Sequence, residues 1–402
     1  MTLVGTHSNL CDFFAREALP PFEQTGWDDF RNRFSTPAAD LAKPLSELPA
    51  DYSRGTVASS WRDTACKIGR IVLMIILFPW GLYAGTKYLF QRLIMTIVFP
   101  LQSDAACFKP YKREILDRFR QRIQPNLNRT HIVEITPGTF IEGMKSPYLV
   151  RQIILEKEGR RYRALMIVTA HSLKCRNWVL HAPGNGIPIE YCAEHYARYY
   201  TQDQNANLLI VQGPGAGGND GEVPTTDLGE PCELALSCIE THFKAKNIIL
   251  SGHSLGGASI GQAIKQHTFN TKKYNYIVVR QMTFDSTGNM GYRWVGFNKW
   301  FTCSCLGRMA EWLVKWTDCH IDNVEASRIL QEKQIVEIII QAGEDEVIPQ
   351  EAFLSQALQA EGITGSKLFE FIPNARHAAM STSLTPLLQK HPCGVAFLNQ
   401  SC

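Results

Sequence analysis

The chain has 402 residues, 45% of them hydrophobic, and its 41 basic residues nearly balance its 38 acidic residues. This length is sufficient for one large core with an additional segment. The net charge of +3 comes without a stripe of Lys and Arg, so no nucleic-acid partner is expected. No histidine stands at zinc-ligand spacing from the close cysteine pair Cys303 and Cys305, so no metal site is expected.

The first 130 residues fall into three segments of different composition. Residues 1–67 are polar and interrupted by prolines, which predicts an extended or short-helical arm. Residues 68–103 are strongly apolar, and residues 104–130 are expected to form a linker helix. Residues 1–5 carry no basic side chain and no long apolar run follows them. We therefore expect synthesis in the cytoplasm without a cleaved signal peptide.

The apolar segment 68–103 has two interpretations. Its uncharged run, residues 71–86, is shorter than the roughly 20 residues that a bilayer span requires. Basic residues flank the run, and it contains Trp80 and Tyr83, side chains that favour the headgroup region. A segment associated with a membrane surface is therefore expected. The alternative is a pair of buried helices packed against the rest of the protein.

From residue 131 onward, apolar strands alternate with helices. This pattern predicts an α/β protein with a doubly wound, mostly parallel sheet. The expected strands are 132–135, 151–155, 164–168, 178–180, 207–211, 247–250, 276–284, 334–340 and 367–372, and the expected helices include 190–200, 227–243 and 257–264. The glycine-rich loop 213–221 lacks the lysine of a P-loop and the spacing of a dinucleotide site, so no nucleotide cofactor is expected.

Residues 288–325 form an insertion between two of the expected strands. Half of the eight tryptophans lie there: Trp294, Trp300, Trp312 and Trp316. Such a composition favours a lid that covers an acyl chain, with Trp294 and Trp300 as candidate substrate contacts. An ordinary helical cap that packs its aromatic side chains on the body is the alternative interpretation.

The segment Gly252-His253-Ser254-Leu255-Gly256 lies between an expected strand and an expected helix. A G-x-S-x-G motif in this context is typical of a nucleophile elbow, a turn so tight that only glycine fits on either side of the serine. Ser254 is therefore the candidate nucleophile.

Two further candidates follow later strands. Asp345 comes after strand 334–340, and His377 comes after strand 367–372. The chain order Ser, Asp, His is that of the α/β-hydrolases. Asp285, after strand 276–284, is the alternative acid, whereas Glu344 and Glu346 are expected to be solvated surface charges.

These motifs resemble the α/β-hydrolase superfamily of serine esterases and lipases. The run Asp345-Glu346-Val347-Ile348-Pro349 is similar to its D-x-V-x-P loop, and the run Ala375-Arg376-His377-Ala378-Ala379-Met380 is similar to its G-x-x-H-x-x-M loop, with Ala in place of Gly. The resemblance implies an α/β-hydrolase domain over residues 131–402, with Ser254 as nucleophile, Asp345 as orienting acid and His377 as base. Within the superfamily, the chain is similar to the lipase-like CHLPS and SidB-type proteins of intracellular bacteria.

Acyl transfer also requires an oxyanion hole with two backbone donors. One is expected to be the N–H of Leu255, directly after Ser254. The segment His181-Ala182-Pro183-Gly184-Asn185-Gly186 resembles the superfamily's H-G-N-G loop with two residues inserted, which implies Asn185 as the second donor, with Gly186 and Gly184 as the alternatives. His181 is expected to shape this loop and to contact substrate.

The expected activity is hydrolysis of carboxylic esters, with lipids favoured by the apolar segment and the aromatic insertion. No metal or organic cofactor is required for this chemistry. Two alternatives remain: an esterase or thioesterase with a soluble substrate, and a membrane-docked binding or scaffold protein without catalysis. The expected location is a membrane surface, with secretion as a bacterial effector as the alternative.

Overall fold

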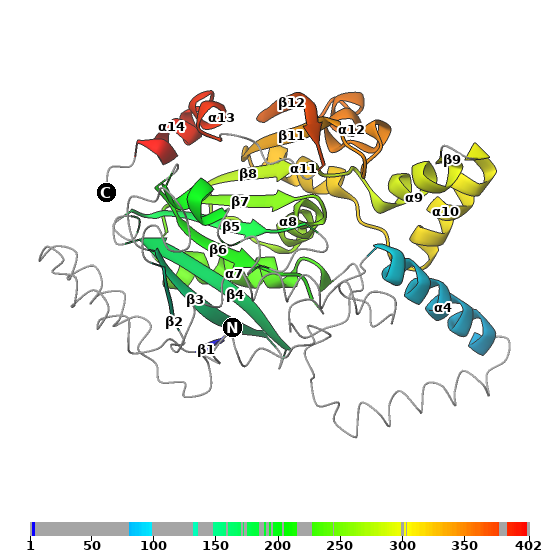
Figure 1. Ribbon diagram of the computed structural model, residues 1–402, viewed down its shortest axis with the longest axis horizontal. Helices are drawn as coiled ribbons and strands as arrows, with labels where there is room; N and C mark the ends of the chain where they lie inside the picture. Colours follow the sequence, from blue (N-terminus) through cyan, green and yellow to red (C-terminus); the bar gives the residue numbers. More distant parts are fainter. Residues whose placement is uncertain are drawn as a thin grey trace, which may run out of the picture.

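A computed structural model of the chain describes sixteen stretches of sequence (Figure 1). They are residues 2–4, 80–98, 132–135, 148–157, 160–169, 172, 175–184, 189, 193, 196–202, 205–214, 227–243, 245–298, 301–302, 304–377 and 384–399. Most of the expected arm 1–67 and the whole expected linker 104–130 lie outside these stretches.

A ten-stranded sheet organises the described residues. Its strands are β1 (Thr2–Val4), β2 (Ile132–Ile135), β3 (Tyr148–Lys157), β4 (Arg160–Thr169), β5 (Asn177–Ala182), β6 (Asn207–Val211), β7 (Asn247–His253), β8 (Asn275–Gln281), β11 (Val336–Glu344) and β12 (Lys367–Arg376). The order is β1-β3-β4-β6-β5-β7-β8-β11-β12, with β2 on β3. The six consecutive strands β6-β5-β7-β8-β11-β12 are parallel to one another, whereas β3 and β4 are antiparallel to their neighbours. The doubly wound, mostly parallel sheet expected from the sequence is therefore confirmed.

Both faces of the parallel strands β5, β6, β7, β8 and most of β11 are buried, which explains their continuous apolar runs, whereas the edge strand β12 is largely exposed or half-buried. Along β7, Ile248 and Leu250 belong to one core cluster, whereas Ile249 belongs to the other. Side chains of successive strand residues point to opposite faces, so one strand contributes to two cores. The first core includes residues of α7 (Glu230–His242) and α8 (Leu255–Gln266), and the second includes residues of α13 (Thr385–Gln389) and α14 (Pro392–Leu398).

Other short helices complete the α/β body. Helix α11 (Asn323–Glu332) packs on α8, and α12 (Leu354–Ala360) follows the 3₁₀ turn Gln350–Ala352. Residues Ala197–Gln202 form a π-helical turn that overlaps the end of the helix expected over 190–200.

Two strand boundaries differ from the sequence expectation because of positive φ angles. Strand β8 ends at Gln281, not at residue 284, because Met282 has φ 46° and turns the chain out of the ladder. Strand β11 begins at Val336, not at residue 334, and Gln334 has φ 56°.

The insertion after β8 forms a helical cap, residues 287–316. It consists of α9 (Thr287–Gly296), a small hairpin of β9 (Phe297–Asn298) and β10 (Phe301–Thr302), and α10 (Ser304–Trp316). The expected lid extended to residue 325, but Asp322 caps α11 by accepting hydrogen bonds from the N–H groups of Val324 and Glu325. Residues from 323 onward therefore belong to the body.

Helix α4 (Trp80–Val98) lies beside the cap at one end of the molecule (Figure 1). Its Tyr83 hydroxyl accepts a hydrogen bond from Trp316 Nε1 at 3.0 Å, and its Lys87 pairs with Asp318 at 2.8 Å. No described side chain of α4 belongs to the buried cores of the body. None of the helices within the described stretches has the length and apolar character to cross a membrane.

Candidate active site

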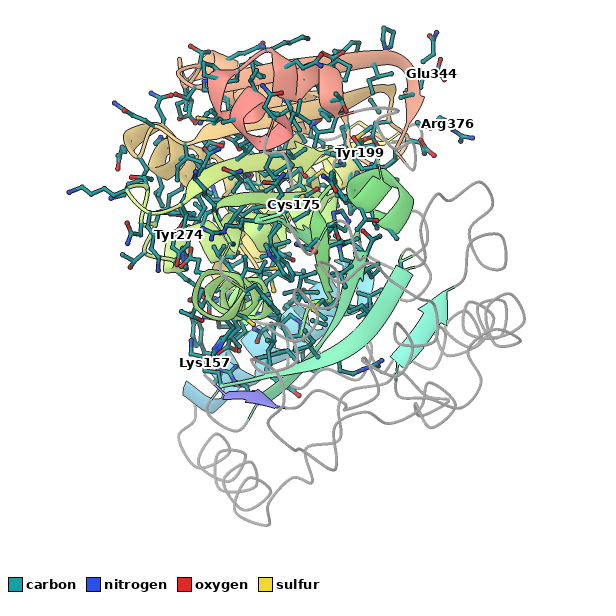
Figure 2. The ribbon with its side chains drawn as sticks, turned by 90° about the vertical axis from the view of Figure 1, so that its left-hand side faces the viewer. Lys157, Cys175, Tyr199, Tyr274, Glu344 and Arg376 are labelled. Atoms are coloured by element: carbon teal, nitrogen blue, oxygen red, sulfur yellow. The ribbon has the colours of Figure 1, made fainter. Side chains whose placement is uncertain are left out.

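Three of the candidate side chains meet at one edge of the sheet. Ser254 follows β7, Asp345 follows β11 and His377 follows β12. Because these strands are parallel, their carboxyl ends face the same side, where open α/β sheets bind ligands. Figure 2 shows Glu344 and Arg376, the residues before Asp345 and His377, at the same corner of the molecule, and the two are paired in the β11–β12 ladder.

Ser254 occupies a strained turn between β7 and α8. Its φ of 53° and ψ of −119° lie in a region that side chains rarely adopt. A Cβ atom at Gly252 would lie 2.5 Å from the carbonyl carbon of Gly256, so glycine is needed for the turn to close. The Ser254 N–H donates to the Gln281 carbonyl at 2.8 Å and anchors the turn to β8.

A continuous chain of hydrogen bonds joins the three side chains. His377 Nε2 lies 2.9 Å from Ser254 Oγ, and His377 Nδ1 lies 2.8 Å from Asp345 Oδ2. Because a carboxylate only accepts hydrogen bonds, Nδ1 carries the proton and Nε2 is left to accept from the hydroxyl. The imidazole is therefore oriented to take a proton from Ser254.

The carboxylate of Asp345 is held by its own loop. Its side chain is fully buried, and Oδ1 accepts hydrogen bonds from the N–H groups of Val347 at 2.9 Å and Ile348 at 2.7 Å. The alternative acid, Asp285, instead accepts hydrogen bonds from Asn289 Nδ2 at 2.7 Å and from the Ser286 N–H. Burial raises the pKa of Asp285 to about 6. The geometry thus favours Asp345 over Asp285 as the partner of His377.

The loop after β5 passes alongside the elbow. A Cβ atom on Gly184 would lie 3.4 Å from the Ser254 Cβ, and one on Gly256 would collide with the Ala182 carbonyl. The N–H of Leu255 opens α8 and has no acceptor within that helix, as expected for a first helical residue. Of the expected second donors, Asn185 and Gly186 lie outside the described residues, whereas Gly184 lies within them.

His181 lies in the core and not at an open surface. Its side chain is fully buried, Nδ1 is 3.1 Å from Ser251 Oγ, and its ring centroid is 3.6 Å from that of Tyr196. The expected contact with substrate is therefore inconsistent with the buried position of His181. Successive side chains of a strand point to opposite faces, and the sequence alone did not show to which face the His181 side chain points.

One of the two candidate tryptophans of the insertion, Trp294, lies among the described residues. Trp294 is exposed on α9, and its Nε1 donates to the Val347 carbonyl at 2.9 Å, which links the cap to the Asp345 loop. Trp300 lies outside the described residues.

Apolar side chains from the elbow, the cap and the Asp345 loop pack together beside Ser254. The cluster contains Leu255, Met290 and Ile348 among its members. Within the described part of the chain, no group of three or more His, Cys, Asp or Glu side chains is placed to hold a metal ion.

Two residues that contact His377 were not expected from the sequence. His253 Nε2 lies 2.9 Å from the His377 carbonyl oxygen, and Glu346 Oε2 accepts a hydrogen bond from the His377 N–H at 3.1 Å. Glu346 is exposed, as expected, but it is also bonded to the backbone. His253 directly precedes Ser254, and Glu346 directly follows Asp345. Their adjacency to two candidate residues was the only sequence signal for these contacts.

A family of known proteins matches most of this chain. Residues 59–385 match the family described as Chlamydia CHLPS protein (DUF818), and the chain belongs to that family. A search of curated protein sequences gave no match.

Several solved structures are similar to the chain. The Pyrococcus furiosus esterase Pf2001 is 14% identical, with a TM-score of 0.42, and the match covers 66% of this chain and 99% of that one. An alpha-beta hydrolase from Vibrio vulnificus is 16% identical, with a TM-score of 0.42 and coverages of 57% and 75%. Est1E from Butyrivibrio proteoclasticus, with ferulic acid bound, is 12% identical, with a TM-score of 0.42 and coverages of 61% and 98%. The chain's own parallel strands, with the Ser254 turn between β7 and α8 and the order Ser254, Asp345, His377 at one sheet edge, are those of the α/β-hydrolase fold.

Proposed function

We propose that this chain is a serine hydrolase that cleaves carboxylic esters, with lipids as its substrate class. The observation that carries the proposal is the hydrogen-bonded chain from Ser254 through His377 to Asp345, with Ser254 in a strained elbow. This combination of a strained nucleophile, a base and an orienting acid is the arrangement used for nucleophilic acyl transfer.

The proposed reaction passes through an acyl-enzyme. His377 accepts the proton of Ser254 as its Oγ attacks the ester carbonyl, and then delivers that proton to the departing alcohol. Asp345 stabilises the imidazolium that forms. The N–H of Leu255, together with an N–H of Asn185 or Gly186, holds the oxyanion. Water then attacks the acyl-enzyme by the same steps and regenerates Ser254.

Exposed apolar side chains on the cap and on the neighbouring helix α4 support a lipid substrate. Most of the exposed large apolar side chains among the described residues lie on α4, α9 and α10. We call the following six the apolar cap surface: Tyr88, Leu89, Trp294, Val295, Met309 and Trp312. A contiguous apolar patch on a folded protein marks a binding site for a membrane, ligand or protein, and we propose that these six side chains form such a patch. We therefore propose that this end of the molecule faces a membrane from which the substrate is taken.

Active-site labelling with a fluorophosphonate probe tests the assignment of the nucleophile. We expect the wild-type protein to label, Ser254→Ala to lose labelling, and His377→Ala to label at a strongly reduced rate. Unchanged labelling of Ser254→Ala would show that another residue is the nucleophile. A wild-type protein that neither labels nor hydrolyses esters would favour the non-catalytic binding function.

The two candidate acids provide a matched control in the same assay. Asp345→Asn is expected to slow labelling roughly 10³- to 10⁴-fold, because an amide cannot hold the imidazole in the required tautomer. Asp285→Asn is expected to label at nearly the wild-type rate, since Asp285 bonds to Ser286 and Asn289 and not to His377.

A further inference from the structure

The main chain of His377 is held at both ends by side chains. His377 comes directly after the last residue of β12, where the ladder with β11 has ended. Its N–H donates to Glu346 Oε2 at 3.1 Å, and its carbonyl oxygen lies 2.9 Å from His253 Nε2. In the described part of the chain, neither group bonds to another main-chain group. Two side chains thus replace the ladder at this residue.

His253 is suited to act as a fixed donor. It is buried at the end of β7, and burial, with the nearby positive charge that His377 can carry, lowers the pKa of His253 to about 4. The ring is therefore neutral at neutral pH and carries one proton. Because the His377 carbonyl only accepts, that proton is on Nε2. A Cβ atom on Gly184 would lie 2.9 Å from Nδ1, so this glycine leaves space for the ring.

Glu346 is suited to act as a fixed acceptor. Its Oε2 accepts from the His377 N–H, while Oε1 lies 3.4 Å from Arg376 Nη2. The hydrogen bond from the His377 N–H lowers the pKa of Glu346 below its usual value, so the carboxylate stays ionised at neutral pH.

We propose that His253 and Glu346 are positioning residues that fix the backbone of His377 and thereby its imidazole. His253 is adjacent to Ser254 in the sequence, so its hydrogen bond connects the His377 main chain to the Ser254 turn. Glu346 is adjacent to Asp345, so its hydrogen bond connects the His377 main chain to the Asp345 loop. Both residues form hydrogen bonds to the His377 main chain, and the His253 ring also lies beside the His377 ring, with 5.3 Å between the ring centroids. The inference rests on the proposed function, since it assigns these two roles around the proposed base.

The expected effect is on turnover and not on substrate binding. A displacement of about 1 Å in a catalytic group can lower the rate by roughly 10²-fold. We therefore expect His253→Ala and Glu346→Ala to lower kcat for p-nitrophenyl butyrate by roughly ten- to hundredfold, with KM within about twofold of the wild-type value. Fluorophosphonate labelling of Ser254 is expected to slow in parallel.

Conservative variants separate positioning from a general structural role. In Glu346→Gln the amide oxygen can still accept from the His377 N–H, and in His253→Gln the amide N–H can still donate to the His377 carbonyl. Both are expected to recover most of kcat. Glu344→Ala is the matched control, because Glu344 is an exposed acid two residues from Glu346 that makes no hydrogen bond to His377 among the described residues. It is expected to keep the wild-type kcat.

The outcomes distinguish this inference from the proposed function. If the full-length wild-type protein fails to label and to turn over the ester, the proposed function is wrong. If the wild type is active and Glu346→Ala and His253→Ala keep the wild-type kcat, the positioning role is wrong and the proposed function stands. A raised KM with unchanged kcat also contradicts the positioning role. Should His253→Ala fail to fold, the exposed Glu346 pair of variants decides the question.

Discussion

Backbone strain at Ser254 is the most informative feature at the scale of single residues. Its φ of 53° would suit glycine, yet a side chain is present there. Strain of this kind costs on the order of 1–3 kcal/mol and persists where the surroundings enforce it. Here the enforcing contacts are the hydrogen bond to Gln281 and the close packing of Gly252 on Gly256.

This strain predicts an unusual order of stabilities at position 254. Ser254→Gly is expected to be more stable than Ser254→Ala by about 1 kcal/mol, because glycine adopts the positive φ without strain. Both variants lack the hydroxyl, so the hydrogen bond to His377 does not bias the comparison. Urea denaturation of the two purified variants provides the measurement.

Ser259, in the interior of α8, is the control for this prediction. There the backbone is helical, and Ser259→Gly is expected to be less stable than Ser259→Ala by about 1 kcal/mol. The same order of glycine and alanine at both positions would rule out strain at Ser254.

The sequence predicted the three side chains of the hydrogen-bond chain but not the contacts of His253 and Glu346. The elbow could be predicted because its tight turn requires small residues at fixed positions, and the five consecutive residues 252–256 contain them. Asp345 and His377 each follow a strand of a parallel sheet, as Asp285 does, and the resemblance of their loops to the hydrolase D-x-V-x-P and G-x-x-H-x-x-M patterns singled them out. The bonds of His253 and Glu346 to the His377 backbone depend on how two distant loops meet, which no local pattern encodes.

At the scale of elements, a buried charge cluster joins three strands below the site. Glu337 of β11 lies between Arg280 of β8 and Lys367 of β12, and all three side chains are fully buried. Glu337 Oε2 is 2.9 Å from Lys367 Nζ, and Arg280 Nε donates to Glu337 Oε1 at 2.6 Å. Burial favours a raised pKa, but the two neighbouring positive charges lower the pKa of Glu337 below its usual value. The apolar pattern of β11 gave no sign of this cluster.

Removing the negative charge from this cluster should destabilise the fold. Glu337→Gln leaves two buried cations with one neutral partner, and the expected loss is about 3–5 kcal/mol. The measurement is the free energy of unfolding from urea denaturation at neutral pH.

An exposed pair on the neighbouring helix provides the comparison. Arg328 of α11 and Glu361 form an ion pair in which both side chains are about half exposed. Glu361→Gln is expected to cost no more than about 1 kcal/mol, because solvent screens the exposed pair. If both substitutions cost the same, the buried cluster does not stabilise the sheet as inferred.

At the scale of the whole molecule, α4 and the cap form one end of the protein, away from β3 and β4 (Figure 1). Trp316 of α10 lies among aromatic rings from both parts: its ring centroid is 5.5 Å from those of Tyr83 and Trp312 and 6.3 Å from that of Phe90. The apolar segment that lies many residues before the parallel strands is thus packed on the insertion that follows β8.

The apolar cap surface leads to a prediction for membrane binding. Its most exposed members are Leu89, Met309 and Trp312, with exposed fractions of 69%, 50% and 57%. Replacing all three by Ser should reduce co-sedimentation of the full-length protein with phosphatidylcholine vesicles several-fold, because the buried apolar area supplies the binding free energy. Phe371→Ser removes an equally exposed apolar side chain from β12 and should leave co-sedimentation unchanged. Equal binding of the triple variant and the wild type would contradict a membrane-facing cap.

The contact of α4 with α10 also bears on where a minimal fragment of this protein can begin. A fragment that begins just before β3 keeps every parallel strand. It lacks the ring contacts of Trp316 with Tyr83 and Phe90, and it lacks the ion pair of Asp318 with Lys87. A fragment that keeps these contacts therefore starts upstream of Trp80, well before the parallel strands that bear the candidate site.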